Sequence, residues 1–276
     1  MTCVNLSSRD VNVLEKIKDP ESNPAVSVVI DESQPRDPHV TDLAVYDGLV
    51  SRERSIIRAI QSIETRFSDS QAQDANETAI QGYTQCRADL DALIAEFPNY
   101  ASARNNRAQI IRRLYGDALL LDFTTDVPLP LVEQPDGAEK QAAAVIALQD
   151  LEKSIALLSP ATLSTPISPQ AARTLSMAYT QRAAIYLRTS KLLPHRALHV
   201  HGSRAEAEWS HVDFEQAASH DLAYGGRYGN PIAKGLAVSV NPTAKLCGQI
   251  VREAVKKEYG ASFEPNGVLR RYDGDI

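Results

Sequence analysis

One stretch of the chain, residues 99–117, carries the side chains best suited to binding a partner, and it reads NYASARNNRAQIIRRLYGD. On the helix that this stretch predicts, the polar side chains away from the apolar face are Asn105, Gln109, Arg112 and Arg113. Guanidinium and amide groups form strong hydrogen bonds with carboxylates, and the adjacent amides of Asn105 and Asn106 can hold a peptide backbone. The stretch therefore predicts a polar ledge for an acidic peptide, with a solvated helix face as the alternative.

Residue patterns typical of catalysis are missing from the sequence. It contains no nucleophile elbow, no HExxH pair and no local grouping of Ser, His and Asp. The glycine-rich segment 225–229 lacks the following Lys and Ser or Thr of a phosphate-binding loop, and it is typical of a turn between helices. We therefore predict that the protein is not an enzyme and that it binds no cofactor.

Three histidines, His195, His199 and His201, lie close together in the sequence. The first two are four residues apart, so on a helix they would share one face and could hold a metal ion. Pro194 precedes them and no Asp, Glu or Cys lies between them, which favours a loop with chance histidines. We expect no metal site here.

Composition and charge limit the class of protein. The chain has 276 residues, a net charge of −6 and a pI of about 5.6. Binding to nucleic acid depends largely on neutralising phosphates, so we expect no nucleic-acid partner. Apolar residues make up 43% of the chain and aromatic residues 6%, which favours closely packed helices over a β-sandwich. The densest basic cluster comprises Arg104, Arg107, Arg112 and Arg113.

The three cysteines, Cys3, Cys86 and Cys247, lie far apart. Their spacing supports neither a zinc ribbon nor a disulfide framework, and it indicates a reduced intracellular protein. The sequence contains no apolar run of the length of a signal peptide or a membrane span. We expect a cytoplasmic protein, with the nucleus as the alternative compartment, and no membrane association.

The elements that position these side chains are helices. In residues 99–117 the apolar positions recur at steps of three, four and seven, at Ala101, Ala108, Ile111, Leu114 and Tyr115. Asn99 is the predicted N-cap and Gly116 the predicted C-cap. Residues 176–190 repeat this plan, and there Tyr179, Gln181 and Arg182 are predicted to extend the binding surface.

A second type of helix alternates with the first. It recurs at 86–98, 147–158 and 210–218, each time with an apolar residue four positions after its start. Two helix types that alternate along the chain predict a helical repeat array. From residue 45 on, the predicted helices cover 45–67, 77–96, 99–117, 137–158, 169–193, 210–218, 230–240 and 243–259.

The array divides the chain into three parts. Residues 1–44 are predicted to form an N-terminal arm and linker, with a short helix at 9–18 and an extended segment at 26–30 that lies on the domain. Residues 45–260 form the repeat domain, and 261–276 a tail. Insertions near 118–146 and 194–207 lengthen the array, and the last helix turns Leu246, Cys247, Ile250, Ala254 and Val255 inward.

Several segments resemble the tetratricopeptide repeats. They are 98–109 (PNYASARNNRAQ), 147–153 (ALQDLEK), 213–218 (DFEQAA), 240–247 (VNPTAKLC) and 13–17 (VLEKI) followed by Pro20. Together they resemble more closely the small three-repeat family of tetratricopeptide repeat protein thirty-six, with loop insertions. The resemblance covers nearly the whole chain outside those insertions.

The resemblance implies a stack of helix pairs whose concave groove binds a peptide or a protein surface without catalysis. Chaperone binding is one use of such grooves, in which basic and amide side chains clamp two carboxylates. The middle Asn of that clamp would fall on Asn106. Its basic positions in the third repeat fall on Met177 and Gln181, so the clamp is incomplete here.

We therefore predict an all-α array of three tetratricopeptide-like helix pairs with C-terminal capping helices. The predicted function is that of a non-catalytic adaptor or scaffold for a protein or peptide partner, such as a chaperone, bound in the groove. The alternative is a helical ligand-binding domain or an enzyme of unidentified activity. A deep pocket lined by convergent polar groups would favour the alternative, and a shallow open groove would disfavour it.

Overall fold

The computed structural model of the chain describes residues 28–69, 75–122, 130–162 and 164–259. Within these ranges the chain forms eight α-helices and no β-strand, so the predicted all-α class is confirmed. The predicted helix at 9–18 and the tail at 261–276 lie outside the described residues.

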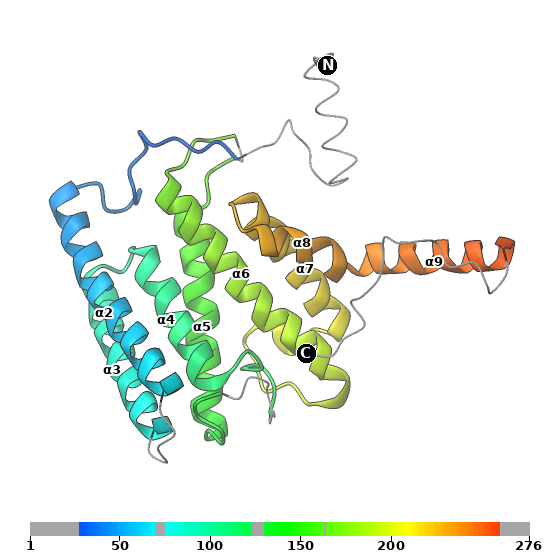
Figure 1. Cartoon of the computed structure of the whole chain (residues 1–276), viewed down its shortest axis with the longest axis horizontal. Coiled ribbons are helices and arrows are strands. Elements are labelled where there is room, and N and C mark those ends of the chain that lie inside the picture. The colour runs from blue at the N-terminus through cyan, green and yellow to red at the C-terminus, as the bar shows by residue number, and fades with distance from the viewer. Residues whose placement is uncertain (1–27, 70–74, 123–129, 163, 260–276) are drawn as a thin grey trace.

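The helices follow the predicted order closely. They are α2 (Leu43–Asp69), α3 (Ala75–Glu96), α4 (Ala101–Tyr115), α5 (Gly137–Leu158), α6 (Pro169–Leu192), α7 (His211–Arg227), α8 (Pro231–Val240) and α9 (Pro242–Tyr259). Each helix packs on the next one along the chain, and α4 also packs on α6. Helices α2 to α8 lie side by side as an array, whereas α9 extends away from it (Figure 1).

Side-chain caps explain where several helices begin. The Asp136 carboxylate accepts hydrogen bonds from the backbone N–H groups of Ala138 and Glu139, at 2.9 and 3.2 Å, and starts α5. Ser168 caps α6 with Pro169 at its first position. The predicted N-cap Asn99 is wrong by one residue, because Tyr100 occupies that position and makes no side-chain cap bond.

Helix α7 is longer than the sequence predicted. The expected helix ended at residue 218 before a glycine-rich turn, but α7 continues to Arg227. A Cβ atom on Gly225 would lie 2.7 Å from Oγ1 of Thr180, and one on Gly226 would lie 2.7 Å from Cα of Lys234. The two glycines therefore let α6 and α8 approach α7 closely, and the turn comes at Gly229, which has a φ of 110°.

The core is built from aliphatic side chains and alanines in the helix interfaces. Ala108 and Ala183, the small residues at the centres of α4 and α6, are fully buried, as is Phe214 of α7. A small residue at such a position lets two helix backbones come close. This packing explains why a core with few aromatic residues suffices for the array.

The last helix departs from the prediction. The side chains that were expected to face inward, Leu246 and Ile250, are each 56% exposed, and Cys247 is exposed as well. The amphipathic pattern identified the apolar face of α9 correctly, but the array does not cover that face. None of the helices in the described ranges is long and apolar enough to cross a membrane.

The predicted insertions pack against each other and against the array. Residues Leu121 and Leu198 form an antiparallel bridge, and the N–H of His199 donates to the carbonyl of Leu120 at 2.8 Å. Ile30 forms a second bridge, with Ile167, so the extended segment predicted around it does lie on the domain. The first bridge anchors the segment 193–210 next to α5, α6 and α7.

A candidate ligand pocket between α5, α6 and α7

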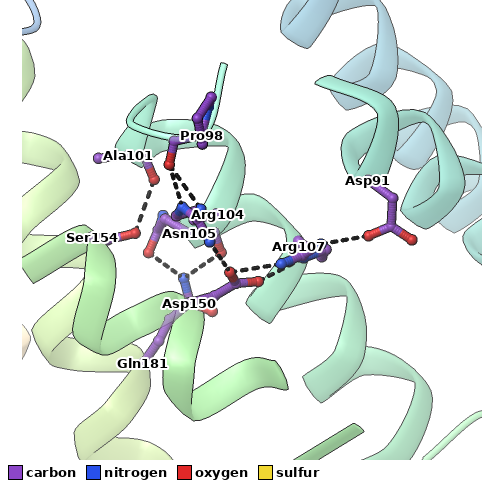
Figure 2. A network of polar contacts seen from close by, with 9 residues as sticks. All are labelled: Asp91, Pro98, Ala101, Arg104, Asn105, Arg107, Asp150, Ser154 and Gln181. Atoms are coloured by element: carbon purple, nitrogen blue, oxygen red, sulfur yellow. Dashed lines mark hydrogen bonds and ion pairs between the residues drawn. The ribbon is translucent and has the colours of Figure 1, made fainter. Parts of the chain in front are cut away.

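A network of charged side chains joins the first helices of the array (Figure 2). The Asp150 carboxylate on α5 is 1% exposed and accepts hydrogen bonds from two arginines of α4. Arg104 donates from Nη1 at 3.0 Å, and Arg107 donates from Nε and Nη2 at 2.6 and 2.8 Å. Arg107 also reaches Asp91 of α3 at 2.6 Å. These arginines therefore hold three helices together.

The predicted ledge on α4 is largely engaged inside the protein. Asn105 is 2% exposed, and its Oδ1 atom accepts a hydrogen bond from Nε2 of Gln181 at 2.8 Å. Arg112 donates to Oε1 of Gln181 at 3.2 Å and to Asp117 at 2.7 Å. These bonds join α4 directly to α6. The predicted groove between the first helices is closed at this point, and Gln109 is the residue of the ledge that is exposed.

The other two residues predicted on α4 contact α2. Nδ2 of Asn106 donates to the Glu53 carboxylate at 2.7 Å, and Arg113 donates to Glu64 at 2.7 Å. Burial raises the pKa of Glu53 and outweighs the hydrogen bonds from Tyr100 and other donors, which lower it. Asn106 thus compensates a buried carboxyl group, which is a structural role.

The predicted residues of α6 have mixed outcomes. Tyr179 is 8% exposed and stacks on Tyr224 and Tyr228, with ring centroids 5.1 and 6.0 Å apart. Arg182 makes a bidentate pair with Asp221 of α7, at 2.7 and 2.8 Å. Of the eight residues predicted on α4 and α6, Arg182 is the one that lines the pocket described next.

The pocket has a volume of about 540 Å³. It lies between α5 and α7, over α6, and its outer wall is the segment that follows α6. The ionisable side chains in its wall are Glu152, Arg182, Arg204, Glu206, His220 and Asp221. The aromatic side chains are Tyr186 and Trp209, whose ring centroids are 5.4 Å apart.

Arg204 organises the charges in this wall. Its guanidinium donates from Nε and Nη2 to Glu206 at 3.0 and 2.9 Å, and its Nη2 also donates to Oε1 of Glu152 on α5. The Tyr186 hydroxyl donates to Glu206 at 2.8 Å. Burial alone would raise the pKa of Glu206, but the bonds from Arg204 and Tyr186 outweigh it and lower that pKa. Glu206 therefore stays ionised at neutral pH.

Sequence reasoning missed most of this site. Glu152 and Arg204 are 52 residues apart, and their contact depends on how the insertion folds back over α5. A usable signal was the chain's single tryptophan, Trp209, in the charged segment RAEAEWSH of that insertion. A tryptophan in a loop among charged residues indicates a partly buried surface that can bind a ligand or a partner.

The histidine cluster does not form a helical pair. His195 ends a short 3-10 turn, Leu193–His195, and the backbone is extended at Arg196, so His195 and His199 do not share a helix face. A loop is the correct interpretation of this segment. In the part of the chain that the structure describes, no three His, Cys, Asp or Glu side chains lie close enough together to hold a metal ion.

Comparison with known proteins changes the functional interpretation. No family model and no solved structure matches the chain, so the resemblance to tetratricopeptide repeats stays a prediction. A relative from Aspergillus fumigatus, the L-tyrosine degradation gene cluster protein hmgX, is 36% identical over 258 residues, which are 92% of this chain and 93% of the relative.

This relative corrects the predicted function. Its name concerns the degradation of an amino acid, a metabolic role, and the predicted function of an adaptor or scaffold is therefore wrong. The alternative of a helical ligand-binding domain or an enzyme agrees better with such a relative. The predicted protein or peptide partner and the predicted compartment stay predictions. The identity and coverage show that the chain belongs to the family of the L-tyrosine degradation gene cluster protein hmgX.

Proposed function

We propose that this protein acts in the degradation of L-tyrosine as a non-catalytic ligand-binding protein, and that its ligand is an aromatic small molecule. The observation that carries the proposal is the open pocket of about 540 Å³ that α5, α6, α7 and the segment after α6 line. Pockets for small molecules have volumes in this range. The name of the hmgX relative supports the chemical class of the ligand.

The aromatic part of the wall suits an aromatic ring. Trp209 packs on Phe214 with centroids 5.1 Å apart and on Tyr186 at 5.4 Å, in tilted arrangements. Clustered rings of this kind gain energy from a further aromatic partner beyond the area that they bury. Trp209 is partly exposed, so it can offer that contact.

The state of the acids in the wall supports binding without catalysis. Asp221 and Glu206 are the buried carboxyl groups of the pocket, at 1% and 4% exposure, and each is held by an arginine. The bonds from Arg204 and Tyr186 hold the pKa of Glu206 below its usual range, so Glu206 is a poor proton donor near neutral pH. The bidentate pair with Arg182 holds Asp221 in place in the wall.

Tryptophan fluorescence gives a direct test, because Trp209 is the only tryptophan in the chain. Excitation at a wavelength that tyrosine does not absorb isolates its emission. Titration with L-tyrosine, tyramine and desaminotyrosine is expected to change that emission in a saturable way for at least one of them. Product analysis after prolonged incubation with each compound is expected to show no conversion.

A matched variant separates pocket binding from general effects. Gln109 is exposed on α4 and does not line the pocket, so Gln109→Ala is expected to bind as the unmodified chain does. Emission that none of the three compounds changes would refute the proposal of an aromatic ligand. Conversion of any of the three would refute the non-catalytic role.

A further inference from the structure

We propose that the pocket recognises an ammonium group, so that its ligands are aromatic amines or amino acids rather than aromatic carboxylic acids. This inference rests on the proposed function, because it concerns the same pocket. It adds the charge of the ligand and the residue that selects it, Glu152.

The charges of the wall leave one carboxylate in excess. Arg182 is paired with Asp221, and Arg204 is paired with Glu206. Each pair is neutral in itself, so among the carboxylates and guanidinium groups of the wall the negative charge of Glu152 is in excess. A ligand with a positive group is therefore favoured over an anion.

Glu152 is also the carboxylate that a ligand can reach. Its side chain is 39% exposed, whereas those of Asp221 and Glu206 are 2% and 5% exposed. The two arginines are shielded too, with 13% of Arg204 and 19% of Arg182 exposed. An incoming carboxylate would have to break a buried pair to reach either guanidinium, and breaking such a pair is strongly unfavourable.

One oxygen of Glu152 retains capacity for a donor. Oε1 accepts the close hydrogen bond from Nη2 of Arg204, whereas Oε2 lies 3.5 Å from Nη1, at the limit of a hydrogen bond. A carboxylate oxygen can accept two hydrogen bonds. An ammonium group that donates to Oε2 would use the remaining acceptor capacity of this carboxylate without displacing Arg204.

The aromatic rings favour the same ligand charge. Cations are attracted to the faces of aromatic rings, most strongly to that of tryptophan. The wall already contains such a contact, since the guanidinium of Arg182 lies 5.9 Å from the centroid of Tyr186. Trp209 lines the same pocket as Glu152. A carboxylate and an indole around one cavity form a suitable setting for an ammonium group attached to an aromatic compound.

Isothermal titration with two analogues of L-tyrosine tests the inference. Tyramine keeps the ammonium group and lacks the carboxylate, whereas desaminotyrosine keeps the carboxylate and lacks the ammonium group. At neutral pH we expect tyramine to bind at least about tenfold more tightly, the worth of one charge-assisted hydrogen bond. Glu152→Gln is expected to remove that preference, and Glu77→Gln, the same change at an exposed site on α3, is expected to keep it.

The outcomes separate this inference from the proposed function. Desaminotyrosine that binds as tightly as tyramine, or more tightly, would overturn the ammonium preference and leave the aromatic pocket in place. A preference for tyramine that persists in Glu152→Gln would overturn the role of Glu152. If L-tyrosine, tyramine and desaminotyrosine all fail to bind the unmodified chain, both proposals would be overturned.

Discussion

Two carboxylates of α5, two residues apart, have opposite roles. Asp150 points toward α4, is 1% exposed and is saturated by Arg104 and Arg107. Glu152 contacts Arg204 of the insertion and has 39% of its side chain exposed. An arginine partner therefore does not by itself give a carboxylate a purely structural role. What differs between the two is how much of the carboxylate stays exposed, 1% for Asp150 and 39% for Glu152.

Removal of Asp150 should have the largest effect. Asp150→Ala leaves Arg104 and Arg107, each with 16% of its side chain exposed, without their shared partner. Breaking a buried pair by removing one member costs about 3–5 kcal/mol, so we expect a loss of that size in the free energy of unfolding. Urea denaturation measures it. A loss below about 1 kcal/mol would mean that the network in Figure 2 is not what joins α3, α4 and α5.

Truncation of Trp209 in the aromatic part of the wall should have the second-largest effect. Trp209→Ala removes the ring that lines the pocket and contacts Tyr186 and Phe214. We expect the free energy of tyramine binding to weaken by roughly 2 kcal/mol, from lost apolar burial and ring contact. Isothermal titration measures the change, and Trp209→Phe should retain part of the affinity. Equal affinity in Trp209→Ala and the unmodified chain would place the ligand elsewhere.

Glu152→Gln should affect binding and spare stability. Its pair with Arg204 is partly exposed, and such pairs contribute about 0–1 kcal/mol to stability. Tyramine affinity should fall about tenfold, because a charge-assisted hydrogen bond becomes a neutral one. Calorimetry of unfolding and of binding on one protein preparation measures both quantities. A stability loss as large as that of Asp150→Ala would erase the contrast between the two carboxylates.

The smallest effect concerns acid pH. The hydrogen bonds from Arg204 and Tyr186 hold the pKa of Glu206 below its usual range despite burial. A carboxyl group whose pKa is lowered by folding stabilises the protein fully above the pKa of the unfolded chain and loses that contribution as pH falls through the folded pKa. The Glu206→Gln variant should therefore show a weaker loss of stability on acidification. Thermal unfolding at a series of acid pH values tests this, and parallel curves would contradict it.

Local signals explain how much of the fold was predictable. The helix positions follow from apolar spacing and from caps such as Asp136 and Ser168, which act within a few residues. The end of α7 was missed because two adjacent glycines, Gly225 and Gly226, are typical of a turn, whereas here they leave room for Thr180 and Lys234. The exposed face of α9 was missed because periodicity identifies an apolar face without telling what covers it.

The site was less predictable than the fold. The residues selected on α4 have the right chemistry for binding, yet Asn105 and Arg112 use it to contact α6. The pocket arises where an insertion returns to α5, and the contact between Arg204 and Glu152 spans 52 residues. No local pattern encodes such a contact, since it depends on the path of the loop. The one local feature that pointed to this segment is the single tryptophan, Trp209.

A crystal structure of the protein with tyramine bound would be the most direct test of the proposed ammonium site at Glu152. We predict that the ammonium nitrogen lies within hydrogen-bonding distance of Oε2 of Glu152 and that the ring packs against Trp209. The bonds from Arg204 to Glu206 should be unchanged. Tyramine bound outside the pocket between α5, α6 and α7, or bound there with its ammonium group turned away from Glu152, would contradict the account.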